Sequence, residues 1–210
     1  AKLALKVVSK GIEYFAKELG IIGESEKSEE VGYRVEEAQR HEDWEKQDDF
    51  PSFEEYYAYL KKQIPDTQID YAKHKENRDR YMALGAMELT KGLEERMEIK
   101  LPEEFLFEIG RSRMEGMEIQ AITETFKMLG YDSVNFSSYL KGKLPREESK
   151  QIENGLLSAM KKYYPSKDED TLYERLGTMR AASRDDEKLA YVYKDELEKI
   201  KENPKSIEDL

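Results

Sequence analysis

Apolar residues recur at helical spacing over the first part of the chain. Between residues 3 and 19 they follow one another at steps of three or four positions: Leu5, Val8, Ile12, Phe15 and Leu19. Gly20 then stands where the left-handed residue that ends many helices would be. This pattern predicts an amphipathic helix that packs on a core or serves for dimerisation or partner binding. Its polar face mixes acids and lysines, which does not favour a membrane surface.

The next stretch, from Ser25 to Asp49, is very polar. Its few apolar residues include Val31, Val35 and Ala38. Two interpretations stay open at this point, because such a segment is typical either of an exposed helix held by ion pairs or of a partly disordered region.

A break at Phe50, Pro51 and Ser52 precedes another predicted helix. Ser52 and Glu55 have the spacing of a capping box, which marks a helix start. The helix that follows carries residues that we expect to line a half-buried seam: Phe53, Tyr56, Tyr57, Tyr59 and Leu60.

The remaining pattern is also helical. From Thr67 to Met97 the spacing predicts one long helix, broken near Asn77 or near Gly85. Further helix signals are Pro102 at a first helical position, Ser166 with Glu169, Ser183 with Asp186 or Glu187, and Pro204 as a stop. No stretch alternates apolar and polar residues as strands do. We therefore predict an all-α, multi-helix protein with a helical region 1–99, a helical domain 100–203 and a tail 204–210.

Charge changes this picture in one respect. Charged residues make up 39% of the 210 positions and the net charge is −11. Residues 28–60 alone contribute −8, whereas residues 126–146 contribute +3. An acidic protein can therefore still present one basic face, and the acidic block is expected to be a solvated face or to screen that basic face.

Composition excludes several kinds of chemistry. The chain has no cysteine, which excludes disulfide scaffolds, thiolate zinc sites and cysteine nucleophiles, and only two histidines. No apolar run reaches membrane-spanning length and the N-terminus lacks the apolar core of a signal peptide, so we expect a cytoplasmic protein without a membrane partner.

The segment from Ile122 to Pro145 is the most informative one. A predicted helix with Ile122, Phe126 and Leu129 ends at Gly130. Asp132 or Ser133 then caps a second helix, and Gly142 ends it; its apolar residues are Val134, Phe136, Tyr139 and Leu140. Two short helices joined by a glycine turn are typical of a helix-turn-helix.

Residues 103 to 163 resemble the helix-turn-helix of the phage-repressor and Cro-like family. There a glycine in the turn lies twelve residues before the glycine that closes the recognition helix, as Gly130 and Gly142 do. Residues 139–143 match the family's aromatic, leucine, polar, glycine, basic ending, and residues 145–157 are similar to the next helix. The resemblance implies a DNA-binding, transcription-regulating unit.

The same resemblance implies which residues face DNA. Those at the base edges would be Ser133, Val134, Ser138 and Lys141; those near phosphates would be Asn135, Ser137, Lys143 and Arg146. Phe136 and Leu140 would point inward. The family usually has a small residue where Phe126 stands, so we expect the two helices either to lie farther apart or to cross at a different angle.

The sequence contains no motif that is typical of an enzyme or of a metal site. His41 and His74 have carboxylates four residues away but no glutamate three residues before them, as a di-iron bundle needs. Nucleophile-elbow and glycine-rich phosphate motifs are missing. We therefore expect no catalytic residue, metal or cofactor.

Two functions stay open. The first is a DNA-binding regulator of the kind found in phages or mobile elements. Its partners would be DNA and, through the first helix, a second copy of the chain or another protein. The alternative is a non-enzymatic helical protein that binds another protein and never contacts DNA. Under that alternative, the six methionines between residues 82 and 128 would form an adaptable binding groove. If the protein has no such partner, the same methionines are expected to fill a core.

Overall fold

The protein is all-helical. The computed structural model describes residues 2–101 and 103–184, with the side chains at 2–4, 7, 103, 104, 107, 133, 134 and 184 left out. These residues form ten α-helices and two short 3-10 helices, and no strand. The α-helices are α1 (Lys2–Glu18), α2 (Ser28–Arg40), α3 (Phe53–Gln63), α4 (Tyr71–Glu76), α5 (Arg78–Met97), α6 (Glu103–Arg111), α7 (Gly116–Leu129), α8 (Ser133–Leu140), α9 (Arg146–Tyr163) and α10 (Glu169–Arg184). The 3-10 helices are Gln47–Asp49 and Asp66–Gln68.

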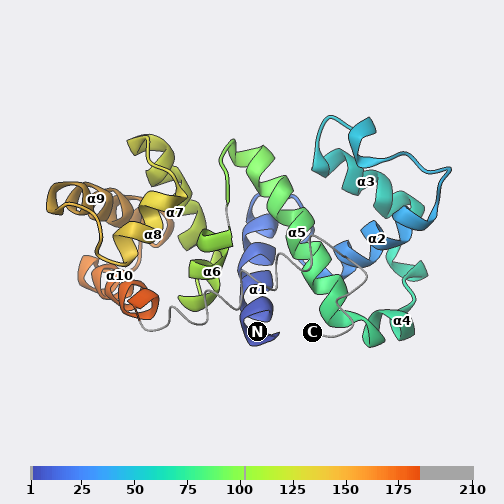
Figure 1. The fold of residues 1–210 in the computed structure, drawn as a ribbon, viewed down its shortest axis with the longest axis horizontal. Helices are drawn as coiled ribbons and strands as arrows, with labels where there is room; N and C mark the ends of the chain where they lie inside the picture. The colour runs from blue at the N-terminus through green and yellow to red at the C-terminus, as the bar shows by residue number, and fades with distance from the viewer. Residues whose placement is uncertain (1, 102, 185–210) are drawn as a thin grey trace.

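The helices are arranged on two sides of α1. Figure 1 shows α2 to α4 on one side, α6 to α10 on the other, and α5 running beside α1. Helix α1 packs against α5 and also against α6 and α7. The first helix thus contacts both of the regions that the sequence divides near residue 100.

The apolar face of α1 is buried inside the chain. Val8, Ile12, Phe15 and Ala16 are at most 1% exposed and belong to a core that reaches from the first helix to α10. The predicted amphipathic helix is confirmed, with Gly20 in the left-handed conformation just after it. Because this face is already covered, it is not open to a second copy of the chain as dimerisation through it would require.

Helix α2 corrects the interpretation of the polar stretch after Ser25. Residues 28–40 of this stretch form a mostly buried helix that packs closely on α5, whereas residues 41–49 are mostly exposed. The acids of α2 form ion pairs with bases of the facing helix: Glu29 with Arg78 at 2.8 Å, and Glu36 with Arg80. Part of the acidic block 28–60 therefore faces arginines of the same chain.

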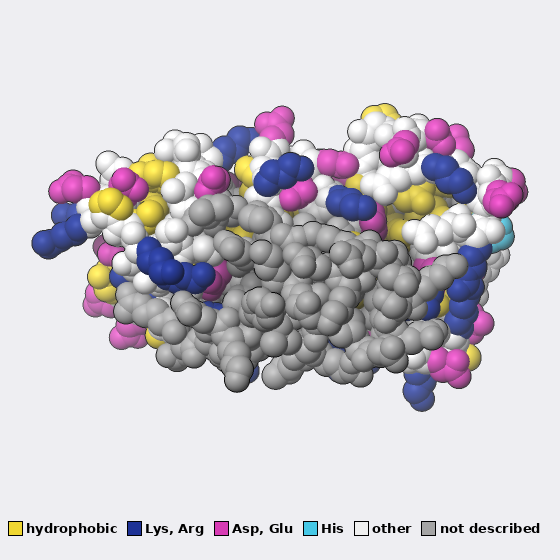
Figure 2. Space-filling view, in the orientation of Figure 1, with side chains coloured by type: hydrophobic (Ala, Val, Ile, Leu, Met, Phe, Trp, Pro, Cys, Tyr) yellow, Lys and Arg dark blue, Asp and Glu magenta, His cyan; other side chains and the backbone are white. Residues whose placement is uncertain are grey.

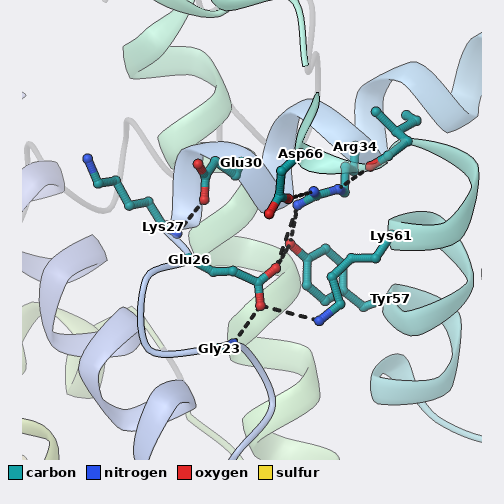
Figure 3. A network of polar contacts seen from close by, with 9 residues as sticks. Gly23, Glu26, Lys27, Glu30, Arg34, Tyr57, Lys61 and Asp66 are labelled. Carbon is teal, nitrogen blue, oxygen red and sulfur yellow. Dashed lines mark hydrogen bonds and ion pairs between the residues drawn. The ribbon is translucent and has the colours of Figure 1, made fainter. Parts of the chain in front are cut away.

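Arg34 is the largest fully buried side chain among the described residues, at 0% exposure. Figure 3 shows it pointing from α2 toward Tyr57 of α3 and Asp66, with Glu26 of the loop before α2 nearby. Its guanidinium donates to the Ile64 carbonyl and the Tyr57 hydroxyl, both at 2.9 Å, and pairs with Asp66. Tyr57 in turn donates to Glu26 at 3.0 Å. The Arg34 guanidinium and the Tyr57 hydroxyl thus both find partners, as a buried charge and a buried hydroxyl require.

Several helix boundaries follow the prediction. Ser52 caps α3 by accepting from the Glu55 amide at 3.3 Å. Tyr56 and Tyr57 are buried and Tyr59 is half-buried, close to the seam expected for them. The long helix after Thr67 is broken at Asn77, between α4 and α5, and continues unbroken through Gly85.

Two predicted helix caps are wrong. Helix α10 begins at Glu169 with the Asp168 carboxylate accepting from the Thr171 amide at 2.7 Å, so Asp168 rather than Ser166 provides the cap. Ser183 lies within α10, where its hydroxyl donates to Glu108 at 2.9 Å. Its expected partners Asp186 and Glu187, and Pro204, lie outside the described residues.

Across the described residues, no helix combines the length and the apolar character that crossing a bilayer needs.

Candidate functional site

Helices α7 and α8 are joined by a glycine turn at the predicted residues. Gly130 has a φ of +71°, which non-glycine residues rarely adopt. The Tyr131 amide donates back to the Phe126 carbonyl at 3.0 Å, as in a Schellman ending. Gly142 has a φ of +68° and the Lys143 amide donates to the Ser138 carbonyl at 2.8 Å. Both helices therefore end with the same backbone motif.

Asp132 and Asn135 cap the start of α8 reciprocally. The Asp132 carboxylate accepts from the Asn135 amide, and the Asn135 side-chain oxygen accepts from the Asp132 amide, both at 3.0 Å. Of the two predicted capping residues, Asp132 is therefore the one whose side chain caps α8. The side-chain oxygen of Asn135 is already hydrogen-bonded within the turn. The side chains of Ser133 and Val134 lie outside the described part of α8.

An aromatic cluster fixes how α8 lies on its neighbours. The ring of Phe136 meets Phe105 of α6 and Phe126 of α7 edge to face, with both centroid distances 5.3 Å. Such edge-on pairs are the favourable geometry for phenyl rings. Phe126, which stands where the resembling family has a small residue, is thus accommodated by the Phe136 ring. Phe136 and Leu140 are 1% and 0% exposed, so both point inward as expected.

A second face of α8 is also covered. Helices α6 and α10 pack on α8, and Ser137 is only 4% exposed. Its hydroxyl has no hydrogen-bond partner among the described residues. The expectation that Ser137 reaches a phosphate does not fit this position, because its side chain faces the interior. The periodicity of α8 did not show this, since a serine carries no apolar signal.

Tyr139 links α8 to α9 and α10. Its hydroxyl donates to Glu153 at 3.2 Å, and the Arg180 guanidinium lies 5.4 Å from the centre of its ring. Burial, and then the negative charge of Glu153, raise the pKa of the Tyr139 hydroxyl, which keeps it a proton donor. This contact holds the inner side of α8 in place, so only a narrow outer stripe remains open.

The open stripe and its continuation contain the other predicted residues. Asn135 and Ser138 are half-buried on α8, and Lys141 is half-buried directly after it. Lys143 is exposed in the connection to α9, and Arg146 is exposed at the start of α9. The structure therefore brings together five of the eight residues expected to face DNA.

The cations of this region form no ion pair within the part of the chain that the structure describes. No ion pair among the described residues includes Lys141, Lys143 or Arg146, nor Lys150, which is exposed one helical turn after Arg146 on α9. Many other cations are paired within the chain; examples are Lys127 with Glu98, Lys162 with Glu124 and Arg180 with Glu153. We did not predict Lys150 from the sequence, although its spacing from Arg146 places both on one face.

The acids near these cations belong to the first turn of α9. Glu147 is exposed and Glu148 half-buried, and carboxylates at a helix start are favourable to the helix dipole. On the face drawn in Figure 2, basic and acidic side chains are intermixed around the rim, so neither sign dominates that face. The four free cations are thus a local feature.

The histidines take part in aromatic contacts. The His41 ring stacks on Trp44 with centroids 4.1 Å apart, and buried His74 lies against Tyr33 and Tyr81. Among the described residues, no group of three or more His, Asp or Glu side chains has the arrangement of a metal site.

Helices α7 and α8 follow one another across a glycine turn and bury aromatic residues between them, and the face of α8 around Ser137 is also covered. The resemblance to the phage-repressor and Cro-like family stays a prediction. Comparison of the chain with protein-family models, curated proteins and solved structures finds no match.

Proposed function

We propose that this protein is a DNA-binding regulator that uses α8 and the start of α9. The observation that carries the proposal is the group of four unpaired cations, Lys141, Lys143, Arg146 and Lys150, directly after a helix joined to α7 by a glycine turn. Unpaired lysine and arginine side chains can neutralise phosphates and release counterions, which supplies most of the affinity of such proteins for DNA.

The outer stripe of α8 supports contact with base edges. Ser138 is short, and Asn135 retains its amide nitrogen although its oxygen caps the helix. Short polar side chains let a helix backbone approach the floor of the major groove. Lys141 lies at the end of the same stripe, where it can bind a guanine edge or a phosphate. Under this proposal the protein acts where the DNA lies, in the cytoplasm.

Binding of the native chain to genomic DNA fragments at about 50 mM and about 200 mM salt tests the proposal. Lys141→Glu should weaken the binding strongly at the lower salt. Lys62→Glu is the matched control, because Lys62 is exposed on α3 and takes part in no ion pair among the described residues. A native chain that fails to bind DNA even at the lower salt, or equal losses in both variants, would refute the proposal.

A protein-binding role is the second candidate. Exposed large apolar side chains occur on α7 and α10, where Met128 is 72% exposed, Tyr173 53% and Met117 41%. Methionine is common on adaptable binding surfaces. A pull-down from the native cell extract with the native chain and with Met128→Glu tests this role: a partner lost in the variant supports it, and a monomer that captures nothing contradicts it.

A further inference from the structure

A cavity of about 450 Å³ lies between α6, α7, α8 and residues 99–101. Five buried apolar residues form its walls: Leu101, Phe105, Ile122, Phe126 and Phe136. This volume is within the range of pockets that hold small organic molecules. The cavity is separate from the four free cations, none of which lines it.

The interior of the cavity offers apolar contacts and few polar ones. Phe136 is fixed edge-on between Phe105 and Phe126, so its position is set before anything enters. Thr123 also lines the cavity, but its hydroxyl already donates to the Gln120 carbonyl at 3.0 Å. A molecule that fills this space must therefore have an apolar body, aromatic or aliphatic.

Two lysines and one aspartate lie at the mouth of the cavity. Lys100 and Lys127 line it together with Asp132, whose carboxylate accepts from the Asn135 amide. The side chains of Lys100 and Lys127 are 89% and 54% exposed.

Both lysines of the mouth have ion pairs that are exposed or long, and Lys127 also donates to the Met97 carbonyl at 3.3 Å. Lys127 lies 3.2 Å from Glu98, whose side chain is 80% exposed, and Lys100 lies 3.6 Å from Glu94. Ion pairs of this kind are weak in water, so an incoming anion can replace either glutamate. Two cations at an apolar cavity are complementary to a molecule with one anionic end.

We propose that this cavity binds an amphipathic carboxylate, a small molecule with an apolar body inside the pocket and a carboxylate between Lys100 and Lys127. Tyr131 and Phe136 belong to the turn and to α8 and also line the cavity, so a bound molecule stabilises the position of α8 on α7. Binding of the molecule does not depend on DNA binding; an effect on DNA affinity would rest on the proposed function.

A pair of probes of opposite charge tests the assignment: 1-naphthaleneacetate and 2-(1-naphthyl)ethylamine, which share the same ring system. Isothermal titration calorimetry of the full chain should show one binding site for 1-naphthaleneacetate and at least about tenfold weaker binding of the naphthylethylamine. Binding of 1-naphthaleneacetate should also raise the melting temperature of the protein. Absence of acetate binding, or equal binding of the two probes, would overturn the proposal.

Two variants locate the site. Ile99→Trp narrows the cavity from its half-buried edge and should abolish acetate binding. The double variant Lys100→Glu, Lys127→Glu changes only exposed side chains and should weaken acetate binding at least about tenfold, while Lys62→Glu should not change it. Circular dichroism checks that each variant is folded; if Ile99→Trp unfolds, the double variant decides. Unchanged acetate binding in the double variant would show that the anion is held elsewhere.

Discussion

Gly32 of α2 and Gly85 of α5 lie where the backbones of the two helices touch. A β-carbon on Gly32 would stand 1.9 Å from the carbonyl oxygen of Tyr81, and one on Gly85 would stand 1.6 Å from the carbonyl oxygen of Ser28. Neither obstacle is a side chain that can rotate away. The two glycines therefore determine how closely α2 approaches α5.

Gly32→Ala and Gly85→Ala should each destabilise the fold by about 3 kcal/mol or more, because the helices must separate to admit a methyl group. Urea denaturation measures this change. Gly177→Ala is the matched control, because a β-carbon at this exposed position of α10 meets nothing within 4 Å. It should stabilise the protein by up to about 1 kcal/mol through helix propensity. Equal midpoints for the three variants would contradict the close crossing.

The buried Arg34 gives a second prediction. Arg34→Met should cost about 3 to 5 kcal/mol, because it removes the buried cation that donates to the Tyr57 hydroxyl and to the Ile64 carbonyl. It also leaves Glu26 with Lys61 as its one ion-pair partner among the described residues. Tyr57→Phe should cost about 1 to 3 kcal/mol through the loss of two hydrogen bonds. Arg40→Ala, which breaks ion pairs of a half-exposed arginine, should change stability by less than about 1 kcal/mol. A neutral Arg34→Met would mean that the network does not support the fold.

Glu18 gives a prediction on pH. Burial, and then repulsion from Glu115, raise the pKa of Glu18 from 4.5 to about 7. Because the folded protein holds the proton more tightly than the unfolded chain, the contribution of Glu18 to stability is complete below pH 4.5. It is lost as the pH rises through about 7.

The stability of the Glu18→Gln variant relative to the native chain should therefore increase from pH 5 to pH 8. Urea unfolding midpoints of both proteins at the two pH values measure this change. The gain should stay below about 1 kcal/mol, since water still reaches Glu18. A constant difference between the two proteins across this range would contradict the shifted pKa of Glu18.

Local signals predicted the helices well where a cap or a periodic face marks them. Ser52 indicates the start of α3, and Gly130 and Gly142 indicate the ends of α7 and α8. The burial of α2 could not be predicted in this way. Its charges are satisfied by arginines about fifty residues later, and Gly32 matters only through contact with Gly85.

For the candidate site, the sequence likewise predicted the residues near a helix end but not which side chains are buried. The free cations Lys141, Lys143 and Arg146 lie where the sequence places them, because they flank or follow Gly142, the glycine that ends α8. The burial of Ser137 depends on α6 and α10, which cover α8 from segments distant in sequence. The cavity near Phe136 likewise exists only through the packing of three helices and could not be read from periodicity.

The salt dependence of DNA binding tests the central claim most directly. If the four free cations bind phosphates, a plot of log K against log salt concentration for the native chain should have a slope of about −3 to −4. Lys143→Ala and Arg146→Ala should each reduce the size of the slope by about 1, while Lys62→Ala should leave it unchanged. Slopes that are the same in the native chain and in both interface variants would show that α8 and the start of α9 do not bind DNA.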